Sequence, residues 1–142
     1  EISACLVGSE MCIRDRITTG STVWVTARAS NALLAYSAAR LRSDPGRALI
    51  AKVRVGQAPI GLTALRGDHR ILVANSGMHP GHPACLAVID AAAALAGRPA
   101  LVGVIGAGLL PREFAVEPGG RTALITNSAS HQLEAVNVSQ LG

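Results

Sequence analysis

The residues with the clearest chemical potential lie in one short segment, which runs from His79 to Cys85 and reads His-Pro-Gly-His-Pro-Ala-Cys. Imidazole nitrogens and thiolate sulfurs are preferred zinc ligands, and His79, His82 and Cys85 are spaced three residues apart, so one loop could present all three. A structural zinc usually takes four ligands, and outside residues 1–16 the sequence offers no further Cys and no nearby His for the fourth. Three interpretations stay open: a metal site, a loop that binds another ligand, and a plain Pro/Gly-rich insertion. We expect no metal.

A second candidate is the pair Arg112 and Glu113, which opens a strand-like run. The planar guanidinium of an arginine can clamp an anionic substrate such as a phosphorylated sugar acid. The alternative is an ion pair within the chain at the edge of a sheet. The sequence shows no Ser-His-Asp spacing, no paired carboxylates and no phosphate loop. The glycine-rich segment 103–108 precedes no helix and has the wrong spacing for a nucleotide loop, so we expect no cofactor.

The composition limits the class of protein that positions these residues. Of the 142 residues 49% are hydrophobic, yet only Trp24, Tyr36 and Phe114 are aromatic, and 15 glycines and 7 prolines are spread along the chain. This is typical of many short strands between turns. The net charge is +4, but the basic residues do not cluster and aromatic residues for base stacking are missing, so we expect no nucleic-acid partner. No apolar run approaches the roughly 20 residues of a membrane span.

An internal repeat is the most informative feature of the chain. Apolar, strand-like runs around Val25, Val73 and Ile125 align at spacings of 48 and 52 residues. The segment 30–33 (Ser-Asn-Ala-Leu) returns 100 residues later at 130–133 as Ser-His-Gln-Leu. Each repeat of about 50 residues holds four short strand-like runs separated by turn formers. This is the period of a β-propeller blade.

Several short motifs resemble the blades of YVTN-repeat, lactonase-like β-propellers. They are Val73-Ala74-Asn75, Val88-Ile89-Asp90, Gly56-x-x-Pro59, Pro111-Arg112-x-Phe114-Ala115 and Pro118-Gly119-Gly120-Arg121. The resemblance spans residues 20–142 and implies an all-β fold of about two and a half four-stranded antiparallel blades, taken from a ring of about seven. Such propellers include sugar-lactone hydrolases, redox-enzyme domains and binding proteins, and the matched motifs are structural, so no catalytic residue can be carried over. The resemblance also favours a periplasmic or secreted location.

The repeat places the partial propeller at residues 17–142. Blade one is expected at about 22–56, blade two at about 59–106 and blade three at about 112–139. We expect four strands in blade two and three in each of the others. Asn75 and Asn127 end equivalent strands, and we expect their side chains to satisfy backbone groups in the turns.

The predicted meander also places the candidate site. Alternate loops of a four-stranded meander lie at the same end of the sheet, so the loops after the second strands and the connections between blades share one face beside the channel. By analogy with other propellers, this face is where a ligand binds. The candidate ligand-binding residues on it are Arg28, His79, His82, Arg112, Glu113 and His131.

Residues 1–16 do not fit the repeat. They show no period of 2 or 3.6 and no signal-peptide pattern. They resemble the translation of a transposase-type sequencing adapter, whose codons encode Leu6 to Asp15 in order. We therefore expect a non-native, adapter-derived segment without a strand partner in the blades. Without Cys5 and Cys12 only Cys85 remains, so no internal disulfide is expected.

Two functions stay open from the sequence. The favoured one is a binding or scaffold module that holds an unknown small molecule or protein at the propeller face. The alternative is part of a lactonase-type propeller that hydrolyses a sugar lactone such as 6-phosphogluconolactone.

Overall fold

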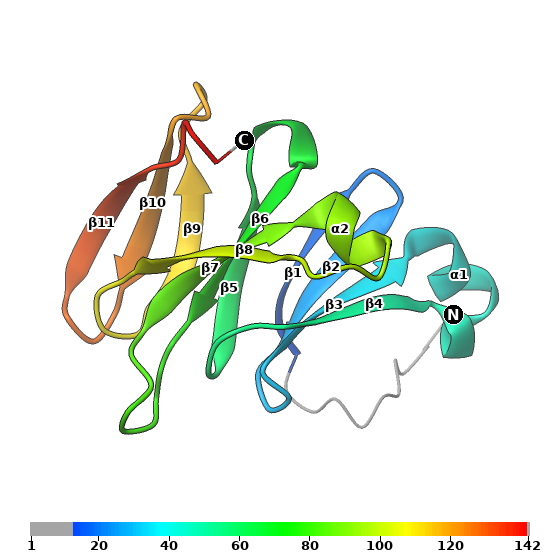
Figure 1. The fold of residues 1–142 in the computed structure, drawn as a ribbon, viewed down its shortest axis with the longest axis horizontal. Helices are drawn as coiled ribbons and strands as arrows, with labels where there is room; N and C mark the ends of the chain where they lie inside the picture. The colour runs from blue at the N-terminus through cyan, green and yellow to red at the C-terminus, as the bar shows by residue number, and fades with distance from the viewer. Residues whose placement is uncertain (1–12, 142) are drawn as a thin grey trace.

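A computed structural model describes residues 13–141 of the chain. In this part eleven strands form three antiparallel sheets, each a meander of strands that follow one another in sequence. Figure 1 shows the three sheets side by side in chain order, and we call them blades one, two and three. Blade one consists of β1 (Ile13–Thr19), β2 (Thr22–Ala27), β3 (Ala32–Ser37) and β4 (Leu49–Arg54); blade two of β5 (Pro59–Ala64), β6 (Arg70–Asn75), β7 (Cys85–Asp90) and β8 (Leu101–Gly106); and blade three of β9 (Pro111–Val116), β10 (Thr122–Asn127) and β11 (Gln132–Asn137).

The first strands of the blades lie next to one another, because β5 contacts both β1 and β9. The fourth strands β4 and β8 form the opposite, outer edges of their sheets, and their residues alternate between exposed and half-buried. Sheets that stack face to face around a set of inner strands are the arrangement of a β-propeller. The chain is therefore an all-β propeller fragment, as the repeat predicted.

Two apolar clusters join the blades. Side chains alternate across a strand, so in β6 Ile71 and Val73 face blade one while Leu72 faces blade three. The first cluster packs them against Trp24 of β2, and the second packs Leu72 against Ile125 of β10. Because blade two is covered on both faces, β6 and β7 consist of nearly unbroken apolar residues.

Blade one has four strands, so the predicted count of three is wrong. The missing strand is β1, and part of it, Ile13 to Arg16, belongs to the segment that we expected to have no strand partner. In β1, Arg16 pairs with Val25 and Ile17 with Trp24. The hydrogen bonds of a sheet are made by the backbone, so a stretch without strand periodicity can still complete it. An adapter origin for residues 1–16 stays a prediction, and residues 1–12 lie outside the described residues.

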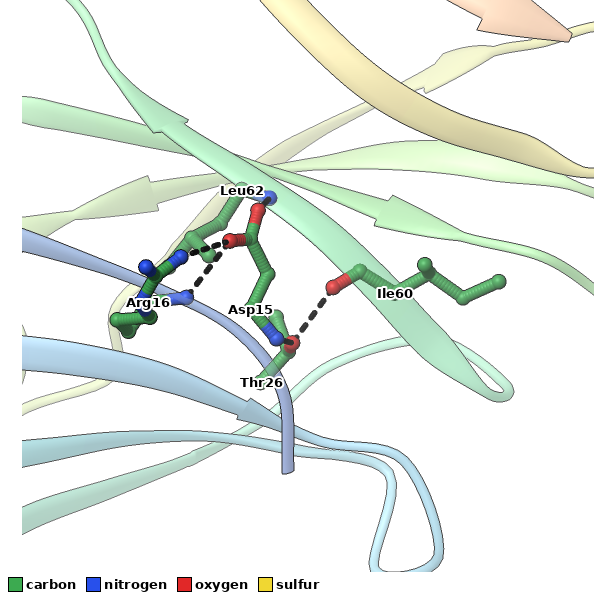
Figure 2. Close-up of polar contacts among 5 residues, drawn as sticks. All are labelled: Asp15, Arg16, Thr26, Ile60 and Leu62. Carbon is green, nitrogen blue, oxygen red and sulfur yellow. Dashed lines mark hydrogen bonds and ion pairs between the residues drawn. The ribbon is translucent and has the colours of Figure 1, made fainter. Parts of the chain in front are cut away.

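Polar side chains connect β1 and β2 to the first strand of the next blade (Figure 2). The Thr26 hydroxyl donates a 2.6 Å hydrogen bond to the carbonyl oxygen of Ile60 and accepts one of 3.2 Å from the backbone N–H of Asp15. The Asp15 carboxylate in turn accepts a 3.2 Å hydrogen bond from the backbone N–H of Leu62. Blade one thus binds two backbone groups of β5, the carbonyl of Ile60 and the N–H of Leu62.

The two asparagines that end β6 and β10 are buried, but they do not satisfy turn backbone as predicted. The amide nitrogen of Asn75 donates to the Cys85 sulfur at 3.6 Å, and that of Asn127 donates to the Glu134 carboxylate at 2.7 Å. Their side-chain oxygens have no partner within residues 13–141. Each side chain lies under a glycine of the connection before its blade, where a Cβ would collide with it: Gly56 over Asn75, and Gly108 over Asn127. The first glycine of each Gly-x-x-Pro motif makes room for this asparagine.

Two short helices follow the third strands of blades one and two: α1 (Ala38–Ser43) and α2 (Ala91–Leu95). Both helices have a side-chain N-cap: the Ser37 hydroxyl accepts a hydrogen bond from the Arg40 N–H, and the Asp90 carboxylate accepts one from the Ala93 N–H. Short 3₁₀ turns lie at η1 (Pro45–Arg47) and η2 (Arg66–Asp68). No helix within the described residues is long and apolar enough to cross a membrane.

The carboxylate of Asp90, which caps α2, also has a lowered pKa and forms an ion pair. The backbone N–H of Ala93 holds the pKa of this carboxyl below its usual value, and the positive charges of Arg70 and Arg98 lower it further, against the opposing effect of burial. Arg70 also forms a 2.8 Å ion pair with Asp90, which ties β6 to the end of β7.

Candidate functional site

The turn between β2 and β3, the loop between β6 and β7 and the connection between β4 and β5 meet at one end of the blades. The side-chain oxygen of Asn31 accepts a 2.8 Å hydrogen bond from the backbone N–H of Ala58, and its carbonyl accepts one of 2.9 Å from Val55. On the other side, the carbonyl of Ala58 accepts from the N–H and the hydroxyl of Ser76. The connection is thus fixed between the loops of two blades.

Left-handed backbone recurs at this end of the molecule. Asn31 and Ala58 have φ of 53° and 50°, and His131 and Leu110, their counterparts around blade three, have 54° and 56°. Positive φ is unfavourable for residues other than glycine and can mark a functional site. Because the same conformation recurs in two blades, we assign it to the geometry of the connection and not to catalysis.

A groove of about 350 Å³ lies between these loops. Its main lining residues are Arg28 and Asn31 from blade one, Gln57 from the connection, and Met78 and His79 from blade two. The Arg28 guanidinium lies against the thioether of Met78, with 2.6 Å between Nη2 and Sδ. The structure therefore brings two of the residues selected from the sequence, Arg28 and His79, into one site built by two blades.

The loop between β6 and β7 separates the two histidines that looked like metal ligands. Gly77 and Gly81 have φ of 59° and 84°, and the loop folds back so tightly that a Cβ on Gly77 would collide with the backbone of residues 82–84. His79 lines the groove, whereas His82 lines a separate hollow of about 360 Å³ beside Leu109.

Cys85 starts β7, and its sulfur contacts Asn75. Among residues 13–141, no three His, Cys, Asp or Glu side chains lie close enough together to hold a metal ion.

The other three candidate residues do not line the groove. Arg112 and Glu113 are exposed on β9, and His131 is exposed in the turn between β10 and β11. The backbone of Arg112 is packed closely on β5, because a Cβ on Gly61 would collide with its carbonyl oxygen. The predicted set is therefore divided between the groove, the hollow beside it and blade three.

The charge of the groove is positive. Among residues 13–141, Arg28 is the charged residue of its lining, no carboxylate contributes, and no ion-pair partner is found for Arg28. Asn31 and Gln57 add amide groups, and His79 adds an imidazole. A guanidinium without a carboxylate partner, together with polar donors, suits a small anion. Sequence reasoning did not identify Met78 as a groove residue. Its position directly before the candidate His79 was the one feature that could have indicated it.

No protein-family model matches the chain, and no curated protein matches it. Several solved structures are similar to it in fold. The hydrazine synthase of Kuenenia stuttgartiensis superposes with a TM-score of 0.67 at 15% identity, over 86% of this chain and 31% of that one. A protein of unknown function from Desulfotomaculum acetoxidans gives 0.69 at 16% identity, over 92% and 38%. A periplasmic gluconolactonase of Pseudomonas aeruginosa gives 0.41 at 19% identity, over 92% and 51%.

The chain thus spans about a third of the length of the first two structures and about half of the third. At these identities the likeness shows the fold alone, and the superposition on the gluconolactonase is too loose to add to it. The fold shared with the first two structures agrees with the three stacked meanders of blades one to three.

Proposed function

We propose that the chain is part of a binding propeller and that the groove between blades one and two holds a small anionic molecule, such as an organic acid or a sugar acid. The observation that carries the proposal is the position of Arg28, which lies in a groove of about 350 Å³ whose lining by residues 13–141 includes no carboxylate. A hollow of this size is at the lower end of the range of small-molecule sites.

Hydrogen bonds also hold the backbone that carries the groove residues, as a binding site requires. Asn31, which accepts from the Ala58 N–H, and Ser76, which donates to the Ala58 carbonyl, fix the Gln57–Ala58 connection, and the loop that carries Met78 and His79 bends at Gly77. Two of the polar groups of the groove, Asn31 and Gln57, therefore lie on backbone that is held at both sides.

Isothermal titration of the chain with gluconate, 6-phosphogluconate and citrate tests this proposal. At least one anion should bind with a stoichiometry near one, and Arg28→Gln should weaken its affinity by roughly tenfold to a hundredfold, because a charged hydrogen bond contributes about 1.5–3 kcal/mol. Arg112→Gln is the matched control, since Arg112 is an exposed arginine outside the groove. Equal losses in the two variants would point to non-specific charge attraction and would contradict the assignment.

The alternative function, hydrolysis of a sugar lactone, requires a general base near the lactone carbonyl. His79 is the side chain of the groove lining that can take this role. Turnover of 6-phosphogluconolactone above the spontaneous rate, lost in His79→Ala, would favour the hydrolase over the binding module.

A further inference from the structure

The bulge of the first strand lies at the same place in all three blades. In each blade, one residue of the first strand pairs with the last residue of the second strand. The bulge follows, and the next pair then joins a residue three positions later on the first strand to one two positions earlier on the second. These pairs are Ile13–Ala27 and Arg16–Val25, Pro59–Asn75 and Leu62–Val73, and Pro111–Asn127 and Phe114–Ile125. Asp15, Gly61 and Glu113 therefore occupy the same bulge position.

Blade three repeats the polar pair by which blade one holds blade two. Thr126 lies 100 residues after Thr26. The backbone N–H of Glu113 donates to the Thr126 hydroxyl at 3.2 Å, as the N–H of Asp15 does to the Thr26 hydroxyl at 3.2 Å (Figure 2). In blade one the carboxylate and the hydroxyl then reach Leu62 N–H and Ile60 C=O. In blade three both side chains are exposed, and no group within residues 13–141 bonds to the Glu113 carboxylate.

Blade two shows that this pair is not a general requirement of the repeat. Its equivalent residues are Gly61 and Ala74, which have no polar side-chain atoms. Here β5 meets β9 by close backbone approach, since a Cβ on Gly61 would collide with the Arg112 carbonyl. An acid and a threonine thus occur on blade one, where Asp15 and Thr26 bind the backbone of β5, and again on the exposed face of blade three.

The apolar residues around the pair match as well. In blade one, Trp24, Leu33 and Ala35 pack against blade two and are fully buried. Their counterparts 100 residues later are Leu124, Leu133 and Ala135, and Leu133 is 67% exposed where Leu33 is 0% exposed. The same face is thus covered in blade one and open in blade three.

We propose that Glu113 and Thr126 form a docking site for the first strand of a further blade, which they bind through its backbone. The occupant presents a carbonyl and, two residues on, an N–H at the free edge of its strand, as Ile60 and Leu62 do in β5. Its apolar face covers Leu133 and its neighbours in continuation of the interface between blades one and two. Glu113 is then a residue of the blade interface and not of the ligand site.

A longer chain supplies the occupant for the test. In the extended protein, the 142-residue chain is fused directly to a second copy of its own residues 96–142. Val138 is the first residue after β11 and Ala91 the first after β7, so residue 142 corresponds to residue 95 and the copy continues the repeat at residue 96. The added copy of β9 offers Arg112 C=O and Phe114 N–H at the positions of Ile60 and Leu62. Amide hydrogen exchange of the original β10 and β11 should slow by at least tenfold in the extended chain, because burial and hydrogen bonds suppress local opening.

Substitution of the original Glu113 then tests the polar pair. Glu113→Ala should speed this exchange by about tenfold in the extended chain, the size of one lost charged hydrogen bond, and should leave it unchanged in the 142-residue chain. Arg112→Ala, an exposed neighbour, is the control. No protection on extension, or an equal effect of Glu113→Ala in both chains, would overturn the proposal.

Two further measurements can overturn it independently of how the extended chain folds. Asp15→Ala in the 142-residue chain should speed exchange at Leu62, and no change there would show that such a pair does not hold a strand. A dimer of the 142-residue chain in light scattering that Glu113→Ala dissociates would make a second copy the occupant, against the proposal.

Discussion

Replacement of Gly61 by alanine should open the junction between blades two and three. A Cβ at this position would overlap the carbonyl oxygen of Arg112 and lie 2.9 Å from its carbonyl carbon, whereas carbon atoms in contact are usually about 3.5–4.0 Å apart. Both obstacles are backbone, so no side chain can turn aside and β5 and β9 must separate. Overpacking of this kind costs about 1–3 kcal/mol. For a chain of this length the Tm should fall by roughly 3–10 °C.

Gly106→Ala is the matched control for this prediction. Gly106 also lies in a strand, its φ is not positive, and a Cβ there would meet nothing within 4 Å. This variant should be neutral or stabilised by about 0.4–1 kcal/mol, because alanine restricts the unfolded chain. Circular dichroism melts and urea titrations at low protein concentration compare the two variants. If Gly61→Ala melts within a degree of Gly106→Ala, the close approach of β5 and β9 is wrong.

Three further predictions follow from the structure. Thr26→Val, which removes the hydroxyl bonded to Ile60, should lower the free energy of unfolding by about 1–3 kcal/mol in urea titrations; an unchanged midpoint would contradict the role of this contact. The depressed pKa of Asp90 means that the carboxylate contributes stability above its unfolded pKa and that this contribution is lost as the pH falls through the folded pKa. The Tm of Asp90→Asn should therefore fall less between pH 7 and pH 3 than the Tm of the original chain does. An equal fall in Tm in the two proteins would refute this. The double variant His79→Ala, His82→Ala should keep its Tm, and calorimetry with zinc should show no stoichiometric binding to the original chain; micromolar binding lost in the double variant would restore the metal site.

The strands of blade two could be predicted from the sequence because burial on both faces leaves a plain signal. Ile71 to Ala74 and Leu86 to Ile89 are continuous apolar runs, and both are buried in the structure. Repetition of these runs at nearly constant spacing then predicts stacked meanders. The two asparagines were misjudged because only the folded chain brings Gly56 and Gly108 over them.

The strand β1 could not be predicted from its side chains. Arg14 and Arg16 are exposed at the edge of the sheet, and the residue that matters most, Asp15, acts across the blade junction on Leu62. Such a contact joins residues 47 positions apart and leaves no local pattern. The resemblance of residues 1–16 to a translated sequencing adapter concerns the origin of the segment, which stays a prediction, and carries no information about the backbone pairing of β1.

The placement of two candidate residues in one groove could be predicted, while their role in binding stays a prediction. Connectivity alone places alternate loops at one end of a meander, and this was enough to bring Arg28 and His79 together. The separation of His79 from His82 depends on the bends at Gly77 and Gly81, whose left-handed conformation the sequence permits but does not require.

The most direct test of the central claim, that the groove between blades one and two binds a small anion, is a map of the binding site by NMR. Backbone amide spectra of the ¹⁵N-labelled chain are recorded during titration with 6-phosphogluconate, at constant pH and ionic strength. The claim predicts saturable shifts for residues 28–31, 57–58 and 78–79, which line or flank the groove, and their loss in Arg28→Gln. Shifts that do not saturate, or that centre on Arg112 and His131 of blade three, would contradict it.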